Sequence, residues 1–130
     1  MHGRKNTYHR RSRPSKFIVN GSIRSSAEIL QVCQEGGVPV VFDAHHHLVH
    51  ERLTNYDNSS VGKALAPARR TWPDQAWQLT HISIGRESFG DMRHSDFITT
   101  LPACYRDDPW LEVAAKAKDH AIARLRDLGW

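Results

Sequence analysis

Short apolar runs alternate with amphipathic segments along this chain, which is the pattern of strands followed by helices. Ser25 and Glu28 have the spacing of a capping box, and they predict a helix that begins there and runs to about residue 35. Two consecutive glycines, Gly36 and Gly37, predict its end. The run VPVVFD at 38–43 is continuously apolar up to its last residue, as expected for a strand that is covered on both faces.

The rest of the chain repeats this alternation after a polar loop. The further predicted elements are strands at 17–19, 77–83 and 110–113, a long loop at 84–108, and helices at 61–70 and 115–128, the first of which Pro67 weakens or bends. Strands that alternate with helices predict an α/β fold of parallel βαβ units with right-handed crossovers. About four such units amount to half of a (β/α)8 barrel of the TIM type, since a whole barrel takes about 250 residues.

Composition narrows the class of protein. The 130 residues suit one domain with one hydrophobic core. No stretch approaches the roughly 20 apolar residues of a membrane-spanning helix, and no signal-peptide pattern is present. Cys33 and Cys104 are too few for a disulfide scaffold and indicate thiols in a reducing compartment. We therefore expect an intracellular protein, in the cytoplasm or on the nucleoid if the source is bacterial.

Charge is concentrated at the start of the chain. The formal net charge is +4, but residues 1–16 hold six basic residues and no acidic one, which leaves 12 basic and 14 acidic residues in the remainder. We predict that 1–16 is a disordered basic tail and that 17–130 is the partial barrel. The tail could bind phosphates, act as a targeting signal or be a solvated leader, so it does not by itself establish DNA binding.

Candidate metal ligands stand where predicted strands end. Asp43 ends the strand at 38–43 and His46 follows three residues later, while His81 is near the end of the next strand and His94 is in the loop after it. Six of the 9 His lie between positions 45 and 94. Because the carboxyl ends of barrel strands meet at one mouth, these side chains could share a metal used in hydrolysis.

Two other interpretations of the histidines stay open. A strand-end histidine can be a hydrogen-bonded core residue, and the triple histidine at 45–47 can be a surface run. His47, His50 and Glu51 also have the helical spacing of a zinc site.

Three separated motifs resemble the UV damage endonucleases: VPVVFDAHHH (38–47), LTHISIGRESFGDMRHSDFI (79–98) and PWLEVAAKAKDHAI (109–122). The resemblance covers residues 17–126 and corresponds to the C-terminal half of the family's TIM barrel. It implies a DNA repair nuclease, a hydrolase of the nucleotide excision repair type. Such an enzyme nicks double-stranded DNA immediately 5′ to UV lesions and uses divalent metals, Mn²⁺ first, with Mg²⁺ or Zn²⁺ as alternatives.

Carried over by motif, the resemblance implies that Asp43, His46, His81 and His94 are the metal ligands. It also implies that Arg86 and Arg93 contact DNA phosphates, although solvated loop charge is an alternative interpretation of both. Two positions where the family has a metal-binding glutamate carry Asn20 and Ala114 here, and Glu112 is a possible weak substitute ligand.

These departures and the half-barrel length set three expectations. We expect one bound metal rather than a complete cluster, and activity of the chain alone stays an open question. We also expect the chain to self-associate or to need the N-terminal half of the barrel, because open parallel edges invite pairing. The alternatives are a non-catalytic DNA- or metal-binding remnant and another metal-dependent TIM-barrel enzyme, such as a sugar isomerase-like protein. The loop GRESFGDMRHSDF (85–97) argues against the second, because it resembles the repair family more.

Overall fold

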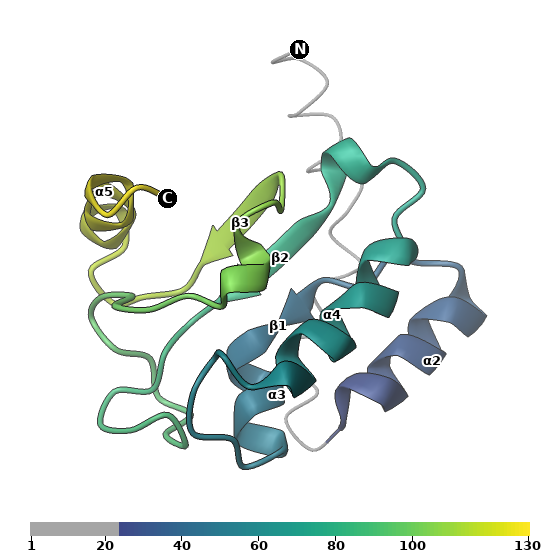
Figure 1. Cartoon of the computed structure of the whole chain (residues 1–130), viewed down its shortest axis with the longest axis horizontal. Helices are drawn as coiled ribbons and strands as arrows, with labels where there is room; N and C mark the ends of the chain where they lie inside the picture. The colour runs from purple at the N-terminus through teal and green to yellow at the C-terminus, as the bar shows by residue number, and fades with distance from the viewer. Residues whose placement is uncertain (1–23) are drawn as a thin grey trace.

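A three-stranded parallel sheet forms the centre of the structure, a computed structural model that describes residues 24–130. Its strands lie in the order β1 (Phe42–Asp43), β2 (Leu79–Ile82) and β3 (Trp110–Val113) (Figure 1). The parallel pairing confirms the predicted α/β class. The tail at 1–16, the strand at 17–19 and Asn20 lie outside the described residues.

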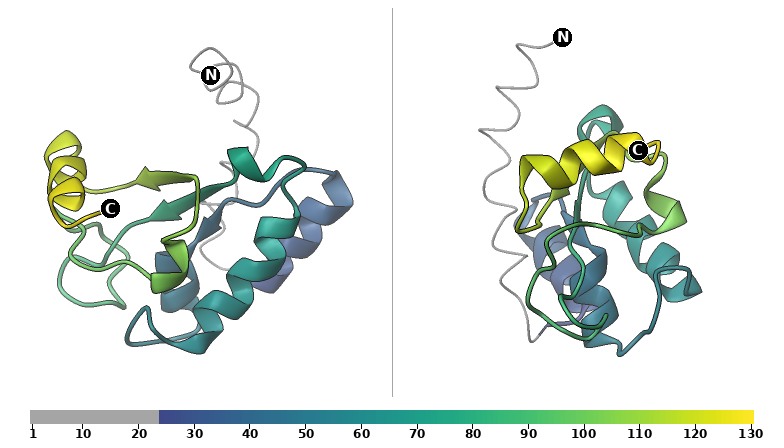
Figure 2. Two further views of the ribbon diagram at one scale, coloured as in Figure 1. Left: turned by 45° about the horizontal axis from the view of Figure 1, so that its top comes forward. Right: turned by 90° about the vertical axis from the view of Figure 1, so that its left-hand side faces the viewer.

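Helices group next to one edge of this sheet. Figures 1 and 2 show α2 (Ser26–Gly36), α3 (Ala44–His50) and α4 (Ser59–Arg70) together beside β1, with α5 (Asp119–Asp127) apart, beyond the end of β3. In the part of the chain that the structure describes, no helix is both long and apolar enough to cross a membrane.

The capping signals of α2 are confirmed. The Ser25 hydroxyl accepts from the backbone amide of Glu28 at 3.1 Å, and the Ser25 amide donates to the Glu28 carboxylate at 3.2 Å. Gly37 takes the left-handed conformation, with φ of 66°, and ends the helix. Ile29 and Cys33 are buried against the core. Local signals alone therefore define this helix.

Gly37→Ala is expected to lower the free energy of unfolding by about 1 kcal/mol, because a Cβ is strained at positive φ. The open space around Gly37 excludes a steric clash as the cause. Gly36→Ala is the matched control: Gly36 is helical, and alanine there should stabilise the fold by about 0.5 kcal/mol. Urea denaturation measures the free energy of unfolding of both variants. Changes of the same sign would show that strain at the positive φ of Gly37 is not the cause.

Three boundaries differ from the sequence-based predictions. The strand at 38–43 is only Phe42–Asp43, and the helix at 61–70 begins earlier, at Ser59, with Pro67 inside it. The polar loop predicted after Asp43 instead begins with a helix, α3. It forms because the Asp43 carboxylate accepts from the His46 amide at 3.0 Å and so caps the first turn.

The C-terminal helix also begins later than predicted, at Asp119 rather than 115. The amides of Ala114, Lys116 and Ala117 donate to carbonyls of β2 and of the loop, and Lys118 has φ of 52°, so this segment follows the sheet instead of coiling. Within α5, Leu125 is buried, whereas Ile122 and Leu128 are exposed.

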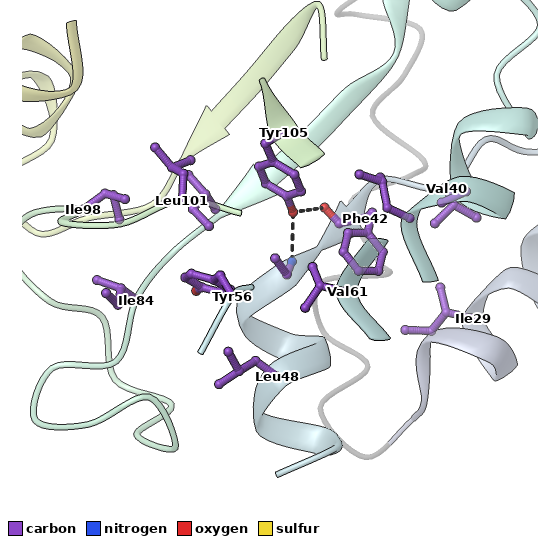
Figure 3. Packing of buried hydrophobic residues seen from close by; sticks show 14 of the residues in the cluster. Ile29, Val40, Phe42, Leu48, Tyr56, Val61, Ile84, Ile98, Leu101 and Tyr105 are labelled. Atoms are coloured by element: carbon purple, nitrogen blue, oxygen red, sulfur yellow. Dashed lines mark hydrogen bonds between the residues drawn. The ribbon is translucent and has the colours of Figure 1, made fainter. Parts of the chain in front are cut away.

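The main core lies between the sheet and the helices beside β1 (Figure 3). Phe42, Leu48 and Val61 pack there with Ile98 and Leu101 from the long loop. A smaller cluster of Val41, Trp72 and Leu79 continues the packing, and Trp77 stacks on Trp110 beside it. Core packing therefore fixes the strand ends from which the candidate site projects.

Candidate functional site

One row of the sheet carries three polar residues. The register pairs Asp43 with His81 and His81 with Glu112, so the three lie side by side on neighbouring strands. Side chains on one row of a parallel sheet point to the same face. Asp43 and His81 are in fact close: the Asp43 Oδ2 atom is 3.8 Å from the His81 Nε2 atom, and both side chains are no more than 10% exposed.

The two oxygens of the Asp43 carboxylate face different groups. Oδ1 accepts the His46 amide at the start of α3, and Oδ2 faces His81. A carboxylate that caps a helix has little rotational freedom, so its second oxygen is directed at the imidazole. The strand end and the helix start thus position the same side chain.

The His81 imidazole has a buried nitrogen without a partner. Its Nδ1 atom makes no hydrogen bond to any of the residues 24–130, although the residue is only 5% exposed. Most buried polar atoms are hydrogen-bonded, so an exception of this kind is a mark of a ligand site or a functional role. His81 therefore has the strongest structural support among the predicted imidazole ligands.

His46 and His94 have other contacts. The His46 Nε2 atom is 3.0 Å from the Arg24 carbonyl oxygen, so it donates a hydrogen bond there. His94 is exposed, in an isolated antiparallel bridge with Gly85. Over residues 24–130 no three His, Cys, Asp or Glu side chains are grouped so that they could hold one metal ion. The four-ligand set stays a prediction, of which the structure brings Asp43 and His81 together.

The two other histidines of the triple run are buried, and the Nε2 atom of His45, like the Nδ1 atom of His81, has no hydrogen-bond partner among residues 24–130. The His45 Nδ1 atom is 2.8 Å from the Ser83 hydroxyl. His47 joins three helices, because its Nδ1 atom is 2.8 Å from the Ser26 hydroxyl and its Nε2 atom is 2.9 Å from the Ser60 hydroxyl. Burial lowers the pKa of both imidazoles. Since both nitrogens of His47 are occupied, the alternative zinc arrangement with His50 and Glu51 finds no support.

The two candidate phosphate contacts differ in their surroundings. Arg93 forms ion pairs with Asp91 at 2.9 Å and with Glu87 at 3.5 Å, and it lowers the pKa of Asp91 to about 2. Arg86 is exposed, and its backbone amide donates to the Arg93 carbonyl at 2.9 Å. The charge of Arg93 is thus largely compensated within its own loop, which leaves Arg86 as the better candidate for a DNA phosphate.

A glycine is required where this loop turns. A Cβ built on Gly85 would lie 1.8 Å from the Ser88 carbonyl oxygen, so no larger residue fits there. The loop therefore has a defined conformation. The Asp91–Arg93 ion pair and the Gly85–His94 bridge hold its two ends together.

The donors fit a divalent metal in kind but are incomplete in number. A carboxylate oxygen and an imidazole nitrogen are ordinary ligands of Mn²⁺, Mg²⁺ or Zn²⁺. The His81 nitrogen that could share a cation with Asp43 is Nε2, which faces Oδ2, whereas the unpartnered nitrogen is the other one, Nδ1, and two donors are fewer than a stable site needs. Glu112 shares their row without joining a three-donor group.

Fold and site together define an α/β protein with an acid–imidazole pair at the carboxyl ends of adjacent parallel strands. The profile of the family described as UV-endonuclease UvdE matches residues 22–129, and the chain belongs to this family. The resemblance predicted from the three motifs is thereby confirmed.

Individual relatives agree with this assignment. The chain is 51% identical over 102 residues to the UV DNA damage endonuclease of Nostoc sp., which is 78% of this chain and 32% of that protein. The chain is 48% identical to the UV DNA damage endonuclease of Deinococcus radiodurans, over 78% of this chain and 33% of that protein. A solved structure, "Crystal Structure of SacUVDE", superposes with a TM-score of 0.56 at 25% identity over 80% of this chain and 36% of that one. The chain thus spans about a third of the length of its curated relatives.

Proposed function

We propose that this chain is a segment of a DNA repair endonuclease that nicks double-stranded DNA immediately 5′ to UV lesions. The observation that carries the proposal is the 51% identity over 102 residues to a protein named UV DNA damage endonuclease. The family match over 22–129 includes both Asp43 and His81, so the strand-end pair lies inside the shared region.

The proposed architecture is part of a (β/α)8 barrel. In barrels of this type the active site is built at the carboxyl ends of the strands, which is where Asp43 and His81 lie. We assign to Asp43 the role of compensating the charge of the cation. His81 is assigned the role of a neutral nitrogen ligand. The exposed guanidinium of Arg86 is assigned to a DNA phosphate. Mn²⁺ is the proposed cofactor, and donors outside residues 24–130 complete its site.

A complementation experiment tests this function. The chain is mixed with the part of the Nostoc relative that it does not match, and the mixture is given Mn²⁺ and a duplex that carries one cyclobutane dimer. Nicking immediately 5′ to the dimer is expected from the mixture and from the intact relative, but not from either part alone. Failure of the mixture, when sedimentation shows that the two parts associate, would contradict the proposal.

A second function has one observation in its favour. Because no three metal donors gather within residues 24–130, the alternative is a chain that binds DNA without catalysis. In the same assay, this alternative predicts that the chain shifts the dimer duplex in a gel without nicking it, whether or not the complementing part is present.

A further inference from the structure

The hydroxyl of Tyr105 lies between the backbones of β1 and β2, next to the two candidate ligands. It accepts from the Ala44 amide at 3.0 Å, and the Phe42 carbonyl is 3.3 Å away (Figure 3). It also donates to the His81 carbonyl at 2.8 Å. Ala44 and Phe42 are the residues on either side of Asp43. One side chain from a distant loop therefore contacts the backbone around both candidate ligands.

This hydroxyl stands where the parallel ladder opens. Asp43 pairs with His81, and the Ala44 amide one residue further along would make the next ladder bond, to the His81 carbonyl. There β1 turns into α3, and the Tyr105 hydroxyl bridges the amide and the carbonyl instead. The width of this opening sets how far apart the side chains of Asp43 and His81 begin.

The position of Tyr105 is itself fixed. It is 3% exposed, ends the short helix η3 (Ala103–Tyr105), and packs edge-on against Phe42 with ring centroids 6.4 Å apart. Burial raises the pKa of the hydroxyl well above its usual value, so the proton stays available for donation. The bridge is thus rigid at both ends.

We propose that Tyr105 is a positioning residue that holds Asp43 and His81 at the separation needed to bind a divalent cation together. This inference rests on the proposed function, because it assigns both residues to a metal site. Partners that orient metal ligands typically contribute 10–100-fold to metal affinity. Tyr105 acts through the backbone of the ligand residues, not on the cation itself.

Tyr105→Phe in the full chain removes the hydroxyl and keeps the ring. We expect the Mn²⁺ affinity of the chain mixed with the complementing part of the Nostoc relative, measured by electron paramagnetic resonance of free Mn²⁺, to fall at least about tenfold. Tyr56→Phe is the matched control, since Tyr56 is also buried and donates to a β2-end carbonyl, that of Ser83, at 2.6 Å. The control should lose comparable thermal stability and change Mn²⁺ affinity less than about twofold. Equal affinity of wild type and Tyr105→Phe would overturn the proposal.

A second readout needs no metal. In Tyr105→Phe the Ala44 amide should exchange with deuterium at least about tenfold faster, and nuclear Overhauser contacts between the His81 ring and the Asp43 Hβ atoms should weaken. If wild type does not bind Mn²⁺, the proposed metal site fails. In that case unchanged His81–Asp43 contacts would separately refute the positioning role.

The wild-type chain provides a measurement that does not depend on how the variant folds. Zn²⁺ added to it should shift the NMR signals of the Ala44 amide and the His81 carbonyl more than those of Ser83. A larger response at Ser83 would count against Asp43 and His81 as the ligands that Tyr105 positions.

Discussion

Asp43→Asn is expected to weaken Mn²⁺ binding by at least about a hundredfold and to abolish any Mn²⁺-dependent nicking. A carboxylate and a divalent cation about 4 Å apart attract by roughly 8 kcal/mol at an effective dielectric constant of about 20. If desolvation offsets two thirds of this attraction, about 2.8 kcal/mol remains, which corresponds to a hundredfold in affinity. Isothermal titration with Mn²⁺ measures the change.

The substitution is chosen so that the fold is kept. Asparagine caps helices as well as aspartate does, so the bond from the His46 amide to Oδ1 should survive in Asp43→Asn. Asp57→Asn is the matched control, because Asp57 is an exposed carboxylate outside the candidate site. If both variants bound Mn²⁺ as wild type does, Asp43 would be a helix cap and not a ligand.

The sequence predicted four ligands, and the structure brings two of them, Asp43 and His81, together, because the two kinds of sequence information differ in range. Asp43 and His81 each lie at the carboxyl end of a strand, and parallel pairing brings such ends together without further knowledge. The choice among His45, His46 and His47 depends instead on the phase of a helix. Consecutive residues there differ in direction by about 100°, so an error in recognising α3 changes which imidazole faces the sheet.

Helix α3 and the contacts of Tyr105 were not predicted from the sequence for the same reason. Helix α2 carries its own start and stop signals in Ser25, Glu28 and Gly37, so local reading sufficed. The N-cap of helix α3 is Asp43, which the sequence predicts as a metal ligand. The buried face of this helix carries polar histidines, so the hydrophobic pattern does not reveal it. Tyr105 is 61 residues from the Ala44 amide that it contacts, and no spacing rule connects positions so far apart.

A buried ion pair outside the candidate site gives the largest expected effect on stability. Arg69, in the last turn of α4, donates to the Asp108 carboxylate at 2.8 Å and also to the Cys104 carbonyl. The Asp108 side chain is only 1% exposed, whereas that of Arg69 is 32% exposed. The pair therefore ties α4 to the segment that leads into β3, and the carboxylate depends on Arg69 for its charge compensation.

Arg69→Met is expected to lower the free energy of unfolding by about 3 kcal/mol, because it leaves the buried Asp108 carboxylate without a counter-charge, with only the side chains of Thr80 and Gln78 to bond it. Methionine preserves the aliphatic stem and the helix propensity. Arg70→Met, one position along and exposed, should change stability by less than about 0.5 kcal/mol. Urea denaturation at pH 7 measures both, and equal losses would show that helix propensity is responsible.

The pH dependence identifies the charge as the cause. Burial raises the pKa of Asp108 and Arg69 opposes that rise, so in Arg69→Met the pKa rises further. A carboxyl whose folded pKa exceeds its unfolded value stabilises the fold at low pH, and this contribution is lost as pH increases through the folded pKa. The deficit of Arg69→Met should therefore shrink as pH falls from 7 toward the unfolded value of about 3.9. Adding Asp108→Asn to Arg69→Met should restore most of the lost free energy of unfolding at pH 7, since the amide needs no counter-charge. If the double variant is no more stable than Arg69→Met, the loss is due to packing and not to charge.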